Sequence, residues 1–385
     1  MIDKKAVIAG LIYLDVTPDL SRMTGEPLHQ MLQPGGLVRT GGTRFSPGGA
    51  VAHTGLTLHR LGIPVRLIGK IGSDRVGQML QDLLRAEATH LAEDLAIDLT
   101  LPTGVSVTIY PPGADPSSLY SPGANDTLYA SDLPRPILEE ADLFHFGGAA
   151  LMRSIYRGEG AELVSILQRA RRAGLTTSLD FTLPDPTSPA WNLDWPSILA
   201  NTLPFVDLFT TGFAELTFLL DRAFFQRTFA DPNLDLSEVI TPDRVEALGE
   251  AILGYGVKAL LVNLGERGMV LRTASATRWQ KGGRGLDGLE ECWHDRHLWA
   301  AAAPEHAHGT LGVDDLAGAA FIASILRGAS PETALKLAGF AHTDNPSNMT
   351  WDSLQAQVAS GWAPSPQDLS PHGWVWNPAQ SLWEK

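Results

Sequence analysis

The stretch HGTLGVDDLAGAAF, residues 308–321, joins a glycine-bearing turn to the start of a helix rich in small residues. The unpaired N–H groups and the positive dipole end of a helix N-terminus bind anions such as phosphate. The residues at this N-terminus would be Gly312, Val313, Asp314 and Asp315. Two carboxylates at such a place would repel a bound anion. The alternative interpretation is that the two aspartates cap the helix.

Three further acidic residues stand near the ends of apolar runs. Asp15, Asp180 and Glu215 each close such a run or follow it within a few residues. Ligands of α/β folds bind at the carboxyl ends of the strands, where a carboxylate can accept hydrogen bonds from hydroxyl groups. Structural roles stay open: Asp180 could cap a loop, and Glu215 could offset the dipole in the first turn of a helix.

The apolar runs themselves predict the fold. Continuous runs of this kind are typical of strands buried on both faces, and amphipathic stretches typical of helices lie between them. The runs cover residues 6–14, 65–72, 142–148, 175–181, 206–212 and 258–265, and the helical stretches cover 50–62, 159–174 and 242–256. This alternation predicts an α/β fold with a doubly wound, mostly parallel sheet flanked by helices.

Two segments interrupt the alternation. Residues 15–48 are rich in glycine and proline, and residues 102–126 alternate apolar and polar residues between proline and glycine turns. Such patterns favour short antiparallel strands. We therefore expect a small β lid, built from parts of residues 12–47 and 103–127, beside the main sheet. A lid over a ligand site excludes water from it.

The rest of the chain is expected to form one main unit and a tail. Residues 1–345 would form the α/β domain, in which residues 273–295 have the composition of an exposed polar insertion. Residues 346–385 contain several tryptophans and prolines, which are typical of a packed, irregular tail.

Composition limits the classes of partner. The formal net charge of −14 argues against nucleic acid or an anionic membrane as the main partner. A single cysteine, Cys292, allows no internal disulfide and favours a cytoplasmic location. The N-terminal apolar run is too short to span a membrane and lacks a cleavage site, so we interpret it as a buried strand.

Four motifs occur in order along the chain. They are GGAVAHTGLTLHRLGIPVRLIGKIGSDRVG (48–77), VDLFTTGFAEL (206–216), LVNLGERG (261–268) and GVDD within residues 308–321. Their paired glycines, the Gly-x-Asp-x-x-Gly turn and the strand followed by Glu215 resemble the ribokinase-like sugar kinases, or PfkB family. The resemblance extends over roughly residues 6–343 and implies a ribokinase-like fold.

The resemblance also implies a role for each candidate residue. Asp315 would be the base that takes a proton from a sugar hydroxyl, at an anion hole formed by Gly312, Val313 and Asp314. Glu215 would organise Mg²⁺ through water. The substrate residues would be Asp15, Gly48, Gly49 and His53, and the nucleotide residues would be Asn263, Gly265, Gly268 and Asp180. Open alternatives are a structural role for His53 on its helix and a tight turn between strands at residues 263–268.

The implied activity is the ATP-dependent phosphorylation of a hydroxyl on a small sugar or related polyol, with ATP and Mg²⁺ as cofactors. Lids in the family often pair between subunits, so a homodimer through the β lid is expected. Ribose, fructose, a ketodeoxy acid and a nucleoside all remain candidate substrates.

The sequence departs from the family pattern at four places. His53 and Gly212 replace asparagines, Gly309 replaces an aspartate, and Asp314 replaces a glycine. The Asp314 side chain could turn to solvent, hold Mg²⁺, or prevent phosphoryl transfer. Gly212, Gly309 and Asp314 favour an alternative function, a non-catalytic sugar- or nucleotide-binding protein that retains the kinase fold.

Overall fold

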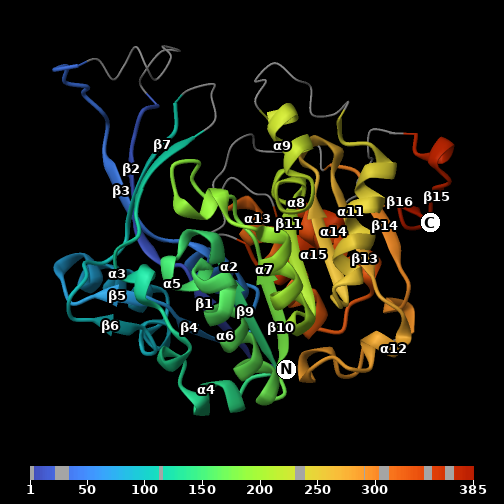
Figure 1. The fold of residues 1–385 in the computed structure, drawn as a ribbon, viewed down its shortest axis with the longest axis horizontal. Helices are drawn as coiled ribbons and strands as arrows, with labels where there is room; N and C mark the ends of the chain where they lie inside the picture. The colour runs from blue at the N-terminus through green and yellow to red at the C-terminus, as the bar shows by residue number, and fades with distance from the viewer. Residues whose placement is uncertain are drawn as a thin grey trace.

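A computed structural model shows a large central β-sheet between two layers of helices, with a smaller sheet at one side (Figure 1). The structure describes residues 4–21, 34–111, 116–229, 239–289, 291–302, 312–341, 349–359 and 368–385. No helix within these ranges is long and apolar enough to cross a membrane. The predicted α/β architecture is confirmed.

The central sheet has ten strands. Its parallel part consists, in spatial order, of β4 (Val65–Ile68), β1 (Ala6–Gly10), β9 (Leu143–Gly147), β10 (Thr176–Asp180), β11 (Leu208–Gly212) and β12 (Ala259–Asn263). Antiparallel strands continue it: β13 (Met269–Thr273), β14 (His297–Ala300), β16 (Leu382–Glu384) and β15 (Val375–Asn377). The carboxyl ends of all the parallel strands therefore lie at one edge.

The side chains of β1 show why helices cover both faces of the sheet. Val7 and Ala9 belong to one hydrophobic core, whereas Ala6 and Ile8 belong to the other. The first core is covered by α6 (Ala161–Arg172), α7 (Trp195–Thr202), α8 (Phe213–Leu220) and α11 (Pro242–Gly254). The second is covered by α2 (Ala50–Arg60), α3 (Arg75–Glu87), α13 (Val313–Leu326) and α14 (Pro331–Phe340). Burial on both faces explains the continuous apolar runs.

Two predicted runs are each divided between two sheets. The run 6–14 forms β1 and the start of β2, and the run 65–72 forms β4 and then β5 (Lys70–Gly72), which pairs with β6 (Ala96–Asp98). The first break follows Gly10, which has a φ of 124° and lies against the backbone of Gly147. Only glycine adopts such a backbone without strain. The expectation of single strands was wrong there.

The predicted small sheet is present. It consists of β2 (Tyr13–Pro18), β3 (Thr43–Gly48), β7 (Val105–Ile109) and β8 (Ser117–Ser121), in the order β3-β2-β7-β8. The β2–β3 and β7–β8 pairs are antiparallel, and β2 and β7 are parallel. Figure 1 shows these strands rising beside the main sheet, so segments about ninety residues apart in the chain form one small layer.

Two other expectations were wrong. Residues 273–295 are not simply an exposed polar insertion, because Trp279 and Trp293 are buried, with ring centroids 5.6 Å apart, and Trp293 also packs against Phe321 of α13. The end of the tail is not irregular, because β15 and β16 extend the main sheet. In both segments, a few apolar side chains are buried against the rest of the protein, although the residues around them are mostly polar.

Candidate active site

A cavity of about 710 Å³ opens between the carboxyl ends of the parallel strands and the small sheet. The ends of β10, β11 and β12 and the starts of α2, α8 and α13 form much of its wall. The predicted site residues that line it are Gly49, His53, Asp180, Glu215, Asn263, Gly312, Asp314 and Asp315. The fold thus brings together residues from distant motifs at the edge where α/β folds bind ligands.

The start of α13 is formed by Gly312, whose φ is 83°, and no side chain caps the helix. The interpretation of Asp314 and Asp315 as caps is therefore wrong, and both residues line the cavity instead. A Cβ atom at residue 312 would lie only 2.6 Å from His53 Nδ1. Glycine is required here for its backbone conformation and for the space it leaves.

His53 and Asp315 form a pair across the starts of α2 and α13. His53 Nδ1 lies 3.0 Å from Asp315 Oδ2, and the two side chains are 28% and 17% exposed. Burial raises the pKa of Asp315 to about 6, although the hydrogen bond with His53 acts to lower it. Burial acts to lower the pKa of His53, but its hydrogen bond with Asp315 and the charge of that carboxylate raise the pKa overall.

Asp180 ends β10 beside this pair. Its Oδ1 atom accepts a hydrogen bond of 2.9 Å from the Gly148 N–H, and its Oδ2 atom lies 3.5 Å from His145 Nε2 in the core. A Cβ atom at Gly147 would lie 2.7 Å from Asp180 Oδ2, so glycine at that position makes room for the carboxylate. The charge of Asp180 is one of the causes that raise the pKa of Asp315.

Glu215 and Asp314 form a second acidic group. Burial, followed by the charge of Asp314, raises the pKa of Glu215 to about 8. Asp314 Oδ1 accepts a hydrogen bond of 2.6 Å from Asn263 Nδ2, so its side chain is held at the cavity wall. A Cβ atom at Gly212 would lie 2.3 Å from Glu215 Oε2 and 3.7 Å from Asp314 Oδ2. The glycine that replaces the family asparagine therefore leaves room for both carboxylates.

The oxygen donors at Glu215 fit Mg²⁺, which binds through one or two carboxylates, water and substrate phosphates. Within the described ranges, no group of three or more His, Cys, Asp or Glu residues is arranged to hold a metal ion by itself.

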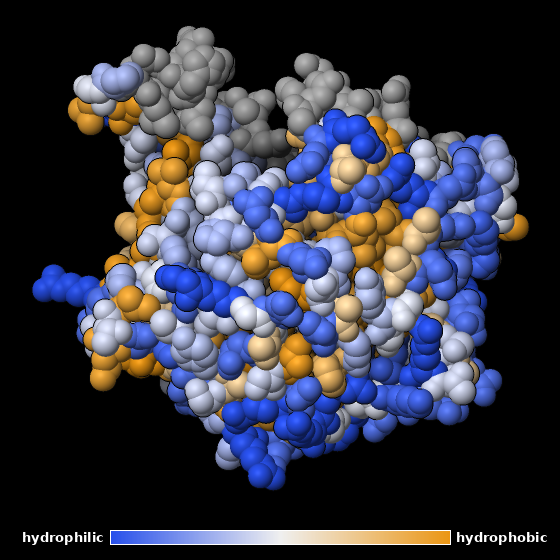
Figure 2. Space-filling model, viewed as in Figure 1, coloured by the Kyte–Doolittle hydropathy of each residue, from blue (hydrophilic) through white to orange (hydrophobic). Residues whose placement is uncertain are grey.

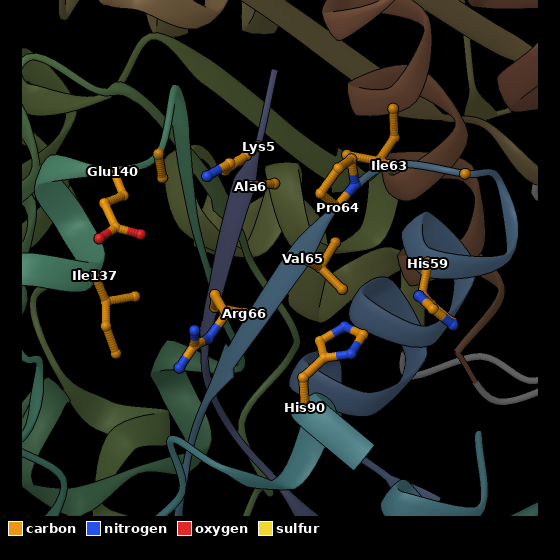
Figure 3. Close-up of a pocket in the computed structure, with 12 residues that line it drawn as sticks. Lys5, Ala6, His59, Ile63, Pro64, Val65, Arg66, His90, Ile137 and Glu140 are labelled. Atoms are coloured by element: carbon orange, nitrogen blue, oxygen red, sulfur yellow. The ribbon is translucent and has the colours of Figure 1, made fainter. Parts of the chain in front are cut away.

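A second cavity, of about 430 Å³, lies at the opposite edge of the sheet (Figure 3). The amino ends of β1 and β4 contribute Lys5, Ala6 and Val65, and His59 and His90 also line it. Among the described residues that line it, none lies at a helix start with adjacent carboxylates, and the charged side chains are Lys5, Arg66 and Glu140. The cavity at the carboxyl ends is the better candidate for the active site.

The sequence profile of the family described as "pfkB family carbohydrate kinase" matches residues 15–341. The chain belongs to the pfkB family. The match contains both acidic groups and the His53–Asp315 pair.

Curated members of the family are similar to parts of the chain. Fructokinase-2 of Oryza sativa subsp. japonica is 27% identical over 184 residues, which cover 47% of this chain and 49% of that protein. The fructokinase of Solanum tuberosum is 28% identical over 170 residues, which cover 43% of this chain and 51% of that protein. The chain thus spans about half the length of the curated relatives it matches.

Solved structures confirm the ribokinase-like fold. A fructokinase with bound ATP from Xylella fastidiosa aligns with a TM-score of 0.65 at 16% identity, covering 93% of this chain and 99% of that one. An Arabidopsis thaliana ribokinase complexed with ribose and ATP aligns with a TM-score of 0.62 at 18% identity, covering 92% of this chain and 98% of that one. At these identities the likeness establishes the fold alone.

Two substrate residues implied by the pfkB family pattern do not line the cavity. Asp15 lies on β2, where its Oδ1 atom accepts a hydrogen bond of 2.7 Å from Thr108 and its Oδ2 atom one of 3.2 Å from Thr17. Gly48 lies against the ring of Tyr13, where a Cβ atom would come within 2.4 Å. Contact of either residue with a sugar stays a prediction.

The nucleotide motif is divided in the same way. Asn263 lines the cavity, and its side-chain oxygen accepts a hydrogen bond of 3.0 Å from the Gly265 N–H. A Cβ atom at Gly268 would lie 2.0 Å from the carbonyl oxygen of Ala300, so this glycine allows a close approach to β14. That contact favours the structural alternative of a tight turn at Gly268. Gly309 lies outside the described residues.

The sequence reasoning missed the part of the wall that the small sheet contributes. Tyr13, Ser106, Ser118 and Tyr120 all line the cavity, and the rings of Tyr13 and Tyr120 lie 5.5 Å apart. In β8, the lining residues Ser118 and Tyr120 follow the two-residue period of a strand face, and β7 contributes Ser106. That period is visible in the sequence, but the face that meets the cavity is decided by how the small sheet sits.

Proposed function

We propose that this pfkB family protein catalyses the ATP-dependent phosphorylation of a hydroxyl group on a small sugar or related polyol. The observation that carries the proposal is the position of Asp315 at the uncapped start of α13, inside the 710 Å³ cavity. A carboxylate base and the free N–H groups of a helix start therefore both face the same cavity. Phosphoryl transfer requires this combination, because it depends mainly on positioning and on stabilising negative charge.

Asp315 takes the proton of the attacking hydroxyl as the new O–P bond forms and the bond to the ADP oxygen breaks. With a pKa raised to about 6, the Asp315 carboxyl group is still mostly ionised at neutral pH, and it is a stronger base than an ordinary aspartate. The amides of residues 312–315 hold the transferred phosphoryl group, as helix N-termini hold anions. Glu215 would hold Mg²⁺ through water, and the ion would neutralise phosphate charge.

The two ends of the cavity take the two substrates. Asp15, Gly48, Gly49 and His53 hold the sugar, together with hydroxyl groups of the small sheet. Asn263, Gly265, Gly268 and Asp180 hold the nucleotide. Fructose and ribose come first in a substrate panel, because the similar proteins named above include fructokinases and a ribokinase complexed with ribose.

The small sheet closes over the sugar and pairs with that of a second subunit. Phe45 and Leu119, on strands of this sheet, are 42% and 70% exposed, and Figure 2 shows apolar side chains on this side of the molecule. Apolar side chains exposed on a sheet favour an interface. We also expect the protein to work in the cytoplasm, as its single cysteine suggests.

The decisive experiment measures ADP release with ATP, Mg²⁺ and a panel of fructose, ribose, a ketodeoxy acid and a nucleoside. We expect turnover with one of them, and a fall in kcat of about 1,000-fold in Asp315→Asn with sugar affinity kept within a few-fold. Asp82→Asn, at a side chain that is 75% exposed, is the control and should match the wild type. Tight sugar binding without ADP release would favour the non-catalytic alternative.

A further inference from the structure

The wall of the active-site cavity carries an unusual charge balance for a site that would receive phosphates. Its acidic lining residues are Asp180, Asp185, Glu215, Asp314 and Asp315. Among the described lining residues, His53 has the only basic side chain. Clustered carboxylates raise one another's pKa and repel anions, so a cation within this group would have a large effect on it.

The position of His53 is fixed from two sides. It lies in the first turn of α2, which begins at Ala50 after Gly49, and the His53 N–H donates to the Gly49 carbonyl oxygen at 2.9 Å. Its ring lies against Gly312, where a Cβ atom would come within 2.6 Å of Nδ1. The ring therefore has little freedom, and its Nδ1 atom is directed at Asp315 Oδ2, 3.0 Å away.

We propose that His53 is a positioning residue that fixes the Asp315 carboxylate toward the cavity and supplies the positive charge that the wall otherwise lacks. The inference rests on the proposed function, in which Asp315 is the base. It deepens that function, because the asparagine usual at this place in the pfkB family could form a hydrogen bond but carries no charge. This chain thus combines an extra carboxylate, Asp314, with an extra cation, His53.

The groups around the pair determine the sign of its pH dependence. Asp180 of β10 faces Asp315, and its charge also acts on Asp314. Glu215 of α8 lies next to Asp314, and Tyr13 and Asp15 of β2 are close enough to act on the pair. None of these carboxyl and phenol groups can carry a positive charge, so among the described residues the imidazole of His53 is the one group near Asp315 that can do so. Loss of His53 therefore raises the pKa of Asp315 further and reduces the fraction of active carboxylate in mildly acidic solution.

The first test needs no enzyme activity. The imidazole of His53 is followed by NMR from pH 5 to 9 in the wild type and in Asp315→Asn, with its signal assigned by its loss in His53→Asn. We expect the pKa of His53 to fall in Asp315→Asn, because the carboxylate that holds its proton is gone. An unchanged pKa would overturn the pairing, whether or not the protein proves to be a kinase.

The second test uses turnover. In His53→Asn, we expect kcat/KM at pH 6 to fall about tenfold and the acid limb of the pH profile to move upward, with a smaller loss at pH 8. His59→Asn, on the same helix but at the other cavity, is the control and should keep the wild-type profile. A raised KM for the sugar with unchanged kcat and pH profile would show that His53 acts only through the sugar contact proposed above, and would overturn the positioning role.

The two tests distinguish failure of the proposed kinase activity from failure of the positioning role of His53. If the wild type releases no ADP with any sugar, the proposed function fails, and the NMR titration alone decides whether His53 and Asp315 are paired. If turnover is found, retention of the wild-type acid limb in a folded His53→Asn variant contradicts the inference while leaving Asp315 as the base.

Discussion

The two cavities lie at opposite edges of the same sheet and differ in how their charges are balanced. At the amino ends of the strands, Arg66 donates hydrogen bonds to both carboxylate oxygens of Asp94, and Glu93 is near the same guanidinium. At the carboxyl ends, acidic groups lie together with one imidazole. In the first arrangement the charges of Arg66 and Asp94 neutralise each other. In the second, the carboxylates repel one another until a cation binds or one of them takes up a proton. This difference is consistent with the proposal that the active site lies at the carboxyl ends of the strands.

The largest difference between the edges should appear when a left-handed glycine is replaced in each. Gly312 and Gly62 have φ values of 83° and 77°, so alanine at either position should lower the free energy of unfolding by about 1–2 kcal/mol. At residue 312 the new Cβ atom would also displace His53, whereas at residue 62 the nearest atom is the end of the Arg327 side chain, at 3.0 Å. We expect kcat/KM to fall about 100-fold in Gly312→Ala and to stay unchanged in Gly62→Ala.

Both variants are assayed at a temperature where circular dichroism shows them folded, and their melting temperatures are compared. A similar loss of activity in the two would mean that lost stability, and not the geometry at the start of α13, is the cause.

A second, smaller difference should appear in the pH dependence of stability without magnesium. The pKa of Glu215 is raised to about 8 by burial and then by the charge of Asp314. A carboxyl group with a raised pKa contributes stability that is complete below its unfolded value, near 4.5, and is lost as the pH rises through 8. We expect the free energy of unfolding to fall by about 2 kcal/mol between pH 5 and 8, after allowing for partial exposure of the group.

Glu215→Gln should flatten this slope in urea titrations at a series of pH values. Glu140→Gln, at the other cavity, is the matched control. If the free energy of unfolding of Glu215→Gln depends on pH as in the wild type, then ionisation of Glu215 beside Asp314 does not destabilise the folded protein.

Much of the scaffold could be predicted because local patterns specify it. The runs at residues 142–148, 175–181, 206–212 and 258–265 contain β9 to β12, since burial on both faces leaves a continuous apolar signal. The break after Gly10 could not be predicted, because it depends on Gly147, which is distant in the chain. The buried tryptophans of residues 273–295 were hidden for a similar reason, since their partner Phe321 lies on another helix.

Sequence motifs predicted individual residues that line the cavity, such as Asp315 and His53, but also Asp15 and Gly48, which do not line it. They did not predict the arrangement. Separate motifs contain Asp315 and His53. The two residues are 262 positions apart in the chain, so the sequence alone does not show that their side chains form a hydrogen bond. The direction of the Asp314 side chain also depends on a distant residue, because Asn263 donates a hydrogen bond to it. Local turn chemistry is thus readable from sequence, whereas the charge balance of the cavity depends on tertiary packing.

The smallest effect is expected at the charge pair of the amino edge. Arg66 is 40% exposed and Asp94 10%, and their bidentate contact lies near solvent. Asp94→Asn should therefore lower the free energy of unfolding by about 1 kcal/mol or less, and less still at high salt. Because β4 and its pair lie at the far edge of the sheet, kcat and KM should not change. A loss of turnover in this variant at unchanged stability would show that the two edges are coupled, and would remove the basis for treating one as structural and the other as catalytic.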